Sequence, residues 1–292
     1  SSNKQSFTKR DVKKAEKLIG LDFSKRDIDT LYPYLKRNRS GFDSLRKYPL
    51  ENDVFPAVRF DPVPLGFEMP EQLNGNDWTI PANVEIPERY DDLAFFTIPQ
   101  LASLIKYKKI TSTELTKFFL ARLKKYQPTL QCSISITDSL ALAQAKRADE
   151  EIQNGQYRGI LHGIPYGTKD LMAVPGYTTT WGAAPYKDQV IDQTATVIQK
   201  LEGAGAVLVA KLVSGALARG DVWFGGKTKN PWDLTQGASG SSAGSGSATA
   251  AGLVPFALGT ETLGSITSPS TRNGVTGLRP TYGRVSRHGV MS

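Results

Sequence analysis

The segment from Gln236 to Pro269 constrains the fold of this chain more than any other part of its sequence. Its first half is built from small residues, because all sixteen positions from Gly237 to Gly252 are Gly, Ala, Ser or Thr. A flexible linker of that composition normally continues into polar sequence, whereas this one runs into the apolar residues 253–258 (LVPFAL). Small residues followed by an apolar run indicate tight backbone packing inside a folded domain and backbone angles that favour glycine.

Two further segments accompany it. Residues 163–170 have the sequence GIPYGTKD, and residues 274–286 have the sequence GVTGLRPTYGRVS. Together with GSSAGSGSATAAGLVPFALGTETLGSI at 240–266, they resemble the amidase signature family of serine hydrolases. Members of that family carry a GVP-x-x-x-KD segment before a segment of the type GGSSGGS…GTDTGGSIR. Three segments in matching order and at compatible spacing are a far more specific signal than any single motif.

The resemblance covers roughly residues 91 to 292 and implies a fold. The expected architecture is an α/β fold, the amidase-signature fold, in which helices cover both faces of a mixed, twisted β-sheet. The alternation of helical and strand patterns from Asp91 onward independently favours such a layered domain. In the family this domain continues well past the position that matches Ser292, so we expect the chain to be incomplete at its C-terminus.

The resemblance also implies the catalytic residues of an amide hydrolase. Ser265 corresponds to the nucleophile, and Ser241 corresponds to a bridging serine that follows a cis peptide bond, here Gly240–Ser241. Lys169, in the GIPYGTKD segment, corresponds to the base. The proton of Ser265 would pass through Ser241 to Lys169 and return through Ser241 to the leaving amine. The expected oxyanion hole consists of backbone N–H groups in one turn, those of Thr262, Leu263, Gly264 and Ser265.

Lys169 has two interpretations. A free lysine has a pKa of about 10.4 and is a poor base while it is protonated near neutral pH. Burial among apolar neighbours such as Ile164 and Leu171 would lower that pKa, because it disfavours the charged form. Alternatively, Lys169 and the adjacent Asp170 form a surface ion pair, as such neighbours usually do. The matched motif favours the first interpretation.

Ser241 and Ser242 also have a structural alternative, as N-caps of a helix formed by the small residues that follow. Three positions depart from the family pattern. Leu263 replaces a glycine in the oxyanion turn, which keeps the N–H group but requires backbone angles that a leucine can adopt. Thr267 replaces an arginine that helps some members hold acidic substrates, which puts recognition of a carboxylate in doubt. Ala243 replaces a glycine after Ser242.

The chain divides into two predicted regions. Residues 1–90 form an N-terminal extension, helical over 1–48 and proline-rich over 49–90, that we expect to pack on the core. Residues 91–292 form the N-terminal part of the amidase signature domain. Strands are predicted at 133–137 and, as a fully buried apolar run, at 206–210. Helices are predicted to begin at polar capping residues, namely Ser24, Thr97, Thr111, Asp138 and Asp192.

Composition argues against several kinds of site. The chain has one cysteine, Cys132, and two histidines, His162 and His288, so we expect no internal disulfide, no metal site, no His-based triad and no cofactor. We interpret Cys132 as a small buried hydrophobe and His162 as structural. The net charge of +8 comes from dispersed Lys and Arg, so nucleic acid is not an expected partner. No apolar run can span a bilayer, so we expect a soluble protein, either cytoplasmic or exported with its signal removed.

Three functions remain open. The leading hypothesis is an amidase that hydrolyses the carboxylic amide of a small molecule or peptide through an acyl-enzyme, with a homodimer as the candidate assembly. The second is the amidase (glutaminase) subunit of a tRNA-dependent amidotransferase, in which the same residues release ammonia for a partner. Leu263, Thr267 and the long N-terminal extension argue against it. The third is a catalytically inactive family member that acts as a scaffold.

Overall fold

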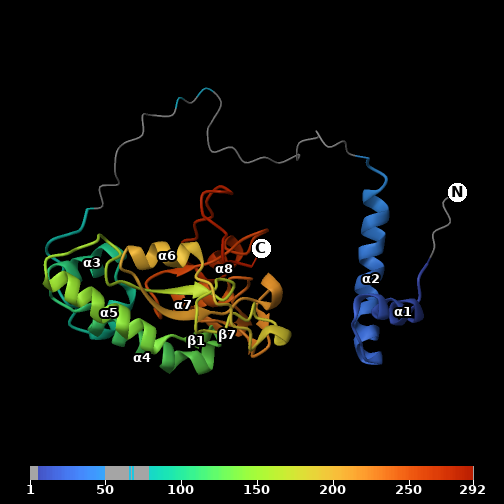
Figure 1. Ribbon diagram of the computed structural model, residues 1–292, viewed down its shortest axis with the longest axis horizontal. Helices are drawn as coiled ribbons and strands as arrows, with labels where there is room; N and C mark the ends of the chain where they lie inside the picture. The colour runs from blue at the N-terminus through green and yellow to red at the C-terminus, as the bar shows by residue number, and fades with distance from the viewer. Residues whose placement is uncertain (1–5, 50–65, 67, 69–78, 292) are drawn as a thin grey trace. The chain divides into compact units, whose positions relative to one another are not determined.

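The computed structural model describes residues 6–49, 66, 68 and 79–291 (Figure 1). These residues belong to two compact units, one ending at Asn74 and one beginning at Gly75. Residues 79–90 therefore belong to the second unit, where the Lys109 ammonium donates to the Val84 carbonyl at 2.9 Å. Most of the proline-rich stretch lies outside the described residues, and the domain boundary expected at residue 90 stays a prediction.

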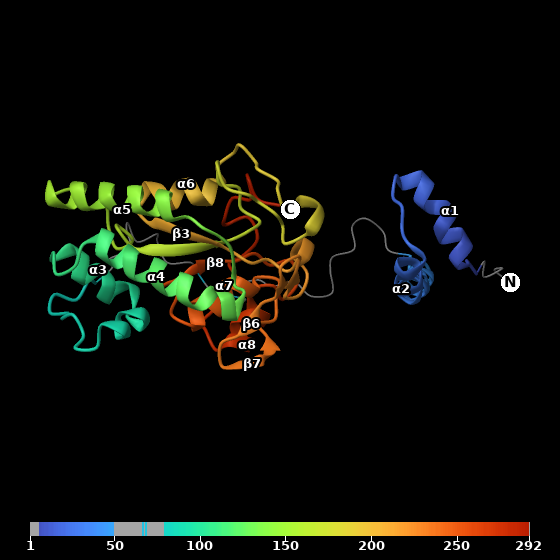
Figure 2. The same ribbon diagram turned by 90° about the horizontal axis from the view of Figure 1, so that it is seen from below.

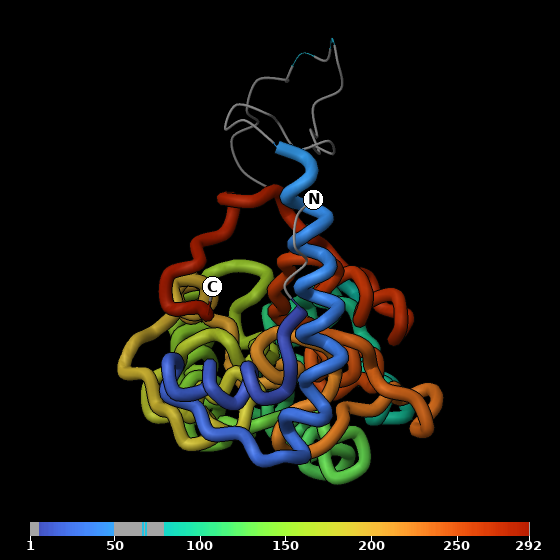
Figure 3. The backbone as a smooth tube through the Cα atoms, turned by 90° about the vertical axis from the view of Figure 1, so that its right-hand side faces the viewer, coloured from blue at the N-terminus to red at the C-terminus, as the bar shows by residue number. Residues whose placement is uncertain are grey.

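Within residues 6–49, the first unit consists of helices α1 (Lys9–Ile19) and α2 (Lys25–Leu45), which cross at a steep angle (Figure 3). Local sequence determines where α2 begins. The Ser24 hydroxyl accepts a hydrogen bond from the Asp27 N–H at 3.2 Å, and the Asp27 carboxylate accepts one from the Ser24 N–H at 2.9 Å. This reciprocal capping box is the start predicted at Ser24.

The second unit is built on a four-stranded mixed sheet in the order β1–β3–β2–β8. Strand β1 (Ser133–Ile136) is antiparallel to β3 (Val207–Leu212), whereas β2 (Pro165–Lys169) is parallel to β3 and to β8 (Ala257–Leu258). The other described elements of this unit are, in chain order, η1 (Tyr90–Phe95), α3 (Ile98–Lys106), α4 (Ser112–Leu130), α5 (Asp138–Gln153), η2 (Ala184–Tyr186), α6 (Thr196–Gly203), η3 (Ala216–Ala218), β4 (Val222–Trp223), β5 (Gly226–Lys227), β6 (Lys229–Asn230), β7 (Asp233–Gly237), α7 (Ala243–Ala250) and α8 (Thr267–Asn273).

Helices cover both faces of this sheet. Every residue of β2 and β3 is buried, as expected for central strands that are covered on both sides. Val207 and Val209 join the apolar cluster that includes residues of α4, α5 and α7, whereas Leu208 joins a different cluster with Ile198 of α6. Figure 2 shows α6 on one side of β3 and α4 and α7 on the other. The expected α/β fold with a mixed sheet is confirmed.

Most predicted element boundaries are confirmed. The Thr97 and Thr111 hydroxyls accept hydrogen bonds from the N–H groups of Gln100 and Glu114, so α3 and α4 begin after the two capping residues at which their starts were predicted. Helix α5 begins at Asp138, as predicted. The two predicted strands are β1 and β3.

The helix predicted to begin at Asp192 begins instead at Thr196, so that prediction is wrong. The residues before it contact other segments. The Ala195 N–H donates to the Ala173 carbonyl at 3.0 Å, and the Thr196 N–H donates to the His288 carbonyl at 3.2 Å. These N–H groups donate to backbone carbonyls from distant segments, so residues 192–195 stay extended or irregular and the helix begins only at Thr196.

Candidate active site

Strand β2 ends at Lys169, whose side chain is completely buried. The Lys169 Nζ lies 2.7 Å from the Ser241 Oγ, 2.8 Å from the Thr260 Oγ1 and 3.4 Å from the Thr260 carbonyl oxygen. The structure therefore brings together two of the three side chains expected to be catalytic, from segments far apart in the sequence.

Burial also determines the protonation of this lysine. Desolvation lowers the pKa of Lys169 to about 7, against the opposing effect of the Glu261 carboxylate, which favours the ammonium form. Near neutral pH a large fraction of the side chain is therefore the neutral amine. That is the form that can accept a proton from a serine hydroxyl.

Asp170 follows Lys169 and faces the opposite side of the strand, because successive side chains of an extended segment alternate. Its Oδ1 lies 2.8 Å from the Lys211 Nζ of β3, and its Oδ2 accepts hydrogen bonds from the Thr180 N–H at 2.8 Å and the Thr180 hydroxyl at 2.5 Å. Asp170 and Lys211 are both completely buried. The alternative of a surface ion pair between Lys169 and Asp170 is therefore wrong.

We expect Asp170→Asn to lower the free energy of unfolding by about 3–5 kcal/mol, because it leaves the buried Lys211 without its counter-charge. The double variant Asp170→Asn/Lys211→Met should recover much of that loss, since it removes the uncompensated charge as well. Equilibrium urea denaturation measures both. As a control, Glu202→Gln breaks the exposed ion pair with Arg147 and should change stability by about 1 kcal/mol or less. A cost for Asp170→Asn no larger than this control would contradict the prediction.

Ser241 follows the cis peptide bond Gly240–Ser241, as the resemblance implied. A Cβ atom added to Gly240 would lie 1.8 Å from the Gly220 carbonyl oxygen, so only glycine fits at that position. Ser242 precedes α7 but does not cap it through its side chain. Instead, the Ser242 hydroxyl exchanges hydrogen bonds with the Thr260 backbone, both at 3.2 Å, and so holds the residue that contacts Lys169.

Ser265 lies in the turn between β8 and α8 and is half-buried. Its carbonyl oxygen accepts a hydrogen bond from the Ser242 N–H at 3.1 Å, which ties this turn to the segment of Ser241. Gly264 has a φ of 80°, in the left-handed region that favours glycine. Leu263 is not among the described residues with positive φ and its side chain is 92% exposed, so the turn accommodates this departure from the family pattern.

The polar groups of this turn are available for a ligand. In the described part of the chain, the N–H groups of Thr262, Leu263 and Ser265 donate to no protein acceptor, and the Ser265 hydroxyl makes no hydrogen bond. Backbone N–H groups in one turn that remain free can stabilise a developing oxyanion. The oxyanion hole and the nucleophilic role of Ser265 stay predictions.

Two residues of the site were missed by the sequence reasoning. Thr260 contacts Lys169 directly, and the Glu261 Oε2 accepts hydrogen bonds from the N–H groups of Ile266 at 2.8 Å and Thr267 at 2.9 Å. Both residues belong to the GTETLGSI segment that carries Ser265. The motif therefore contains both residues, but it does not show which groups their side chains contact.

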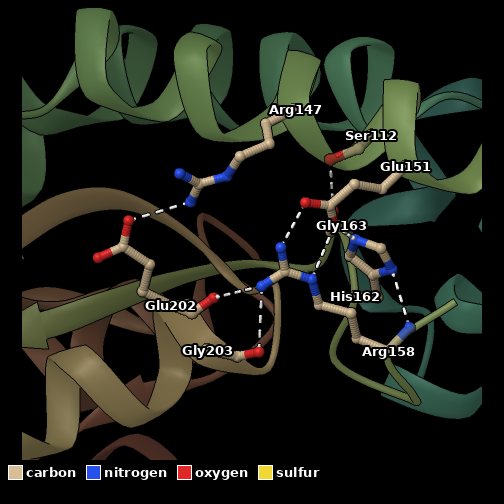
Figure 4. Close-up of polar contacts among 8 residues, drawn as sticks. All are labelled: Ser112, Arg147, Glu151, Arg158, His162, Gly163, Glu202 and Gly203. Carbon is tan, nitrogen blue, oxygen red and sulfur yellow. Dashed lines mark hydrogen bonds and ion pairs between the residues drawn. The ribbon is translucent and has the colours of Figure 1, made fainter. Parts of the chain in front are cut away.

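His162 belongs to a different polar cluster (Figure 4). Its Nδ1 accepts a hydrogen bond from the Arg158 N–H at 3.1 Å, and its Nε2 lies 3.0 Å from the Glu151 Oε2. Burial lowers the pKa of His162, so the ring is neutral near pH 7 and links two chain segments. Cys132 is completely buried, and burial raises the pKa of its thiol to about 12, which keeps it protonated.

Among residues 6–49, 66, 68 and 79–291, no group of three or more His, Cys, Asp and Glu side chains is arranged to hold a metal ion. Within the same ranges, no helix combines the length and the apolar character that crossing a membrane would require.

Curated relatives and solved structures resemble about two thirds of this chain. A glutamyl-tRNA(Gln) amidotransferase subunit from Coxiella burnetii (strain Dugway 5J108-111) is 43% identical over 199 residues, which are 67% of this chain and 41% of that protein. The putative amidase AmiD of Mycobacterium bovis is 40% identical over 217 residues, which are 72% of this chain and 45% of that protein. The chain thus spans less than half the length of these curated relatives.

The native peptide amidase of Stenotrophomonas maltophilia superposes with a TM-score of 0.63 at 35% identity, over 67% of this chain and 42% of that enzyme. A family model described as "Amidase" matches residues 114–292, which include Lys169, Ser241 and Ser265. This match extends over more than half of the sequence and contains the lysine–serine contact described above. The chain therefore belongs to the amidase family.

Proposed function

We propose that the protein hydrolyses a carboxylic amide, with Ser265 as nucleophile, Ser241 as proton bridge and Lys169 as base. The observation that carries this proposal is the buried Lys169 amine, 2.7 Å from the Ser241 Oγ and with a pKa lowered to about 7. A structural lysine at this position would normally be charged and paired with a carboxylate. Here its neighbours are hydroxyl and carbonyl oxygens instead.

The hydrogen-bond partners of Lys169 can also satisfy a neutral amine, which has two N–H donors and one lone pair. The Thr260 carbonyl oxygen can only accept, and the Thr260 hydroxyl can accept as well. If both N–H groups donate to Thr260, the lone pair points to the Ser241 hydroxyl. That orientation is the one a base needs in order to take the Ser241 proton.

The reaction would proceed through an acyl-enzyme. As the Ser265 Oγ attacks the amide carbon, its proton moves to the Ser241 Oγ, and the Ser241 proton moves to Lys169. The free N–H groups of Thr262, Leu263 and Ser265 would stabilise the oxyanion of the tetrahedral intermediate. On collapse, the proton returns through Ser241 to the leaving nitrogen, the C–N bond breaks and an ester on Ser265 remains. Water activated by the same route then releases the carboxylic acid.

Trapping the ester tests this proposal. With a primary amide substrate, hydroxylamine should compete with water for the acyl-enzyme, so a hydroxamate should form at a rate that rises and then saturates with hydroxylamine concentration. The assay uses the protein as it occurs naturally and a panel of small-molecule and peptide amides. Hydrolysis without hydroxamate at any hydroxylamine concentration would contradict an acyl-enzyme. Absence of turnover across the panel, together with absence of serine labelling, would favour the inactive scaffold.

A second candidate is the amidase subunit of an amidotransferase, which the 43% identity to the Coxiella burnetii protein favours. The two candidates use the same acyl-enzyme chemistry but differ in the acceptor of the ammonia. In the second candidate, glutamine hydrolysis should depend on partner subunits and on tRNA. Hydrolysis of simple amides by the isolated protein, at a rate that neither addition changes, would support the stand-alone amidase. A homodimer stays a prediction that sedimentation analysis can test.

A further inference from the structure

Glu261 connects the turn of Ser265 with the residue that contacts Lys169. Its Oε2 accepts three hydrogen bonds, from the Ile266 N–H at 2.8 Å, the Thr267 N–H at 2.9 Å and the Thr267 hydroxyl at 3.2 Å. These donors follow Ser265 directly in the chain. On its other side, Glu261 follows Thr260, whose hydroxyl and carbonyl oxygens contact the Lys169 Nζ. The Glu261 carboxylate therefore holds the turn that carries Ser265. The same residue is adjacent in the chain to Thr260, which contacts Lys169.

The charge of this carboxylate is retained although its side chain is only 8% exposed. Burial acts to raise the pKa of Glu261, but the hydrogen bonds from Thr267 and Ile266, together with the nearby Gly264 N–H, outweigh burial and hold the pKa below its usual value. The Arg279 Nε lies 3.5 Å from the Glu261 Oε1 and is half-exposed. The negative charge of Glu261 therefore favours the ammonium form of Lys169, and Arg279 partly neutralises that charge.

Few other charges face Lys169. Helix α7 and strand β8, which pack against β2, carry no charged side chain. Helix α4 also packs against β2, but its charged side chains are exposed to solvent or, for Arg122, bound to the carbonyl oxygens of Ala251 and Gly252. Strand β3 contributes Lys211, which is paired with Asp170 on the opposite side of β2. Among these neighbours, Glu261 is the charged residue that raises the pKa of Lys169, and Arg279 partly neutralises its charge.

We propose that Glu261 is a positioning residue with two separable effects: it holds the turn that carries Ser265, and its charge sets the pH above which Lys169 works as a base. This inference rests on the proposed function of Lys169 and Ser265. The two effects can be separated because all three hydrogen bonds go to a single oxygen. A glutamine retains one such acceptor but carries no charge.

The test is the rate at which a fluorophosphonate labels Ser265, measured from pH 5 to 9 in the protein as it occurs naturally. In the wild type, the rate should rise with pH as Lys169 loses its proton. Glu261→Gln should shift this rise to lower pH by roughly 0.5–1 unit, because loss of the negative charge disfavours the ammonium form. Its rate on the high-pH plateau should stay within about threefold of the wild type, since the turn is still held.

Two further variants separate charge from geometry. Glu261→Ala loses the acceptor as well, so its plateau rate should fall by roughly 10- to 100-fold. Arg279→Gln removes the neutralising charge and should shift the rise to higher pH, opposite in sign to Glu261→Gln. The control is Glu114→Gln, the same chemical change at a carboxylate that caps α4 by accepting the Thr111 N–H at 2.8 Å. It should leave both the pH profile and the plateau unchanged.

The outcomes distinguish this inference from the function on which it rests. If the wild-type protein is not labelled at Ser265, the proposed function fails. If the wild type is labelled but Glu261→Gln leaves the pH profile in place, or lowers the plateau as much as Glu261→Ala does, the inference about Glu261 is wrong. A shift for Glu261→Gln with an intact plateau, and an opposite shift for Arg279→Gln, supports it.

Discussion

Replacing Ser265 with alanine should abolish covalent labelling by a fluorophosphonate and reduce amide hydrolysis by roughly 10⁴- to 10⁶-fold. The expected effect is this large because no acyl-enzyme can form without the attacking oxygen, so the remaining rate comes only from substrate binding and the oxyanion donors. Mass spectrometry of the labelled protein locates the adduct, and initial rates on the preferred amide give the loss.

Ser268 provides the matched control for that experiment. It lies three residues after Ser265, is exposed, and its hydroxyl hydrogen-bonds to the Ser239 hydroxyl at 2.7 Å. Ser268→Ala should therefore retain labelling and most of the activity. Labelling at full strength in Ser265→Ala, at any serine, would show that another residue is the nucleophile.

Replacing Lys169 with methionine should lower the rate of hydrolysis by roughly 10²- to 10⁴-fold, the usual contribution of a positioned base. Methionine keeps the apolar volume of the buried side chain and removes only the amine. The wild-type rate should rise with pH through the Lys169 pKa of about 7, because the neutral amine is the active form. In Lys169→Met that rise should disappear, so the loss is largest above pH 7.

Lys187→Met is the control, because Lys187 is an exposed lysine whose contact is a weak pairing with Asp188 at 4.0 Å. It should leave the rate and the pH profile unchanged. Since the proposed base is an amine, EDTA should not change the wild-type rate. Inhibition by EDTA that zinc reverses, or an unaltered pH profile in Lys169→Met, would contradict the role of Lys169.

The sequence by itself determined the features that depend on neighbouring residues. The capping residues Ser24, Thr97 and Thr111 placed the starts of α2, α3 and α4, because a cap and the N–H group that it accepts from are three residues apart. The apolar run at 206–210 identified the central strand β3 for the same reason, since period and length are local properties. The motif resemblance supplied the family and the prediction that Lys169, Ser241 and Ser265 are the catalytic residues.

Only the tertiary structure determined which distant groups form hydrogen bonds and ion pairs with the polar atoms of these segments. The late start of α6 follows from contacts of Ala195 with Ala173 and of Thr196 with His288. The partner of Asp170 is Lys211 on the next strand rather than the adjacent Lys169, because alternation on β2 turns the two neighbours to opposite sides. The low pKa of Lys169 likewise depends on burial by other segments. The hydrogen bonds from the turn of Ser265 to Glu261 depend on how that turn folds back on the carboxylate. Desolvation and long-range hydrogen bonds are properties of the packed chain, which is why the motif predicted the candidate site residues but not the charges they carry.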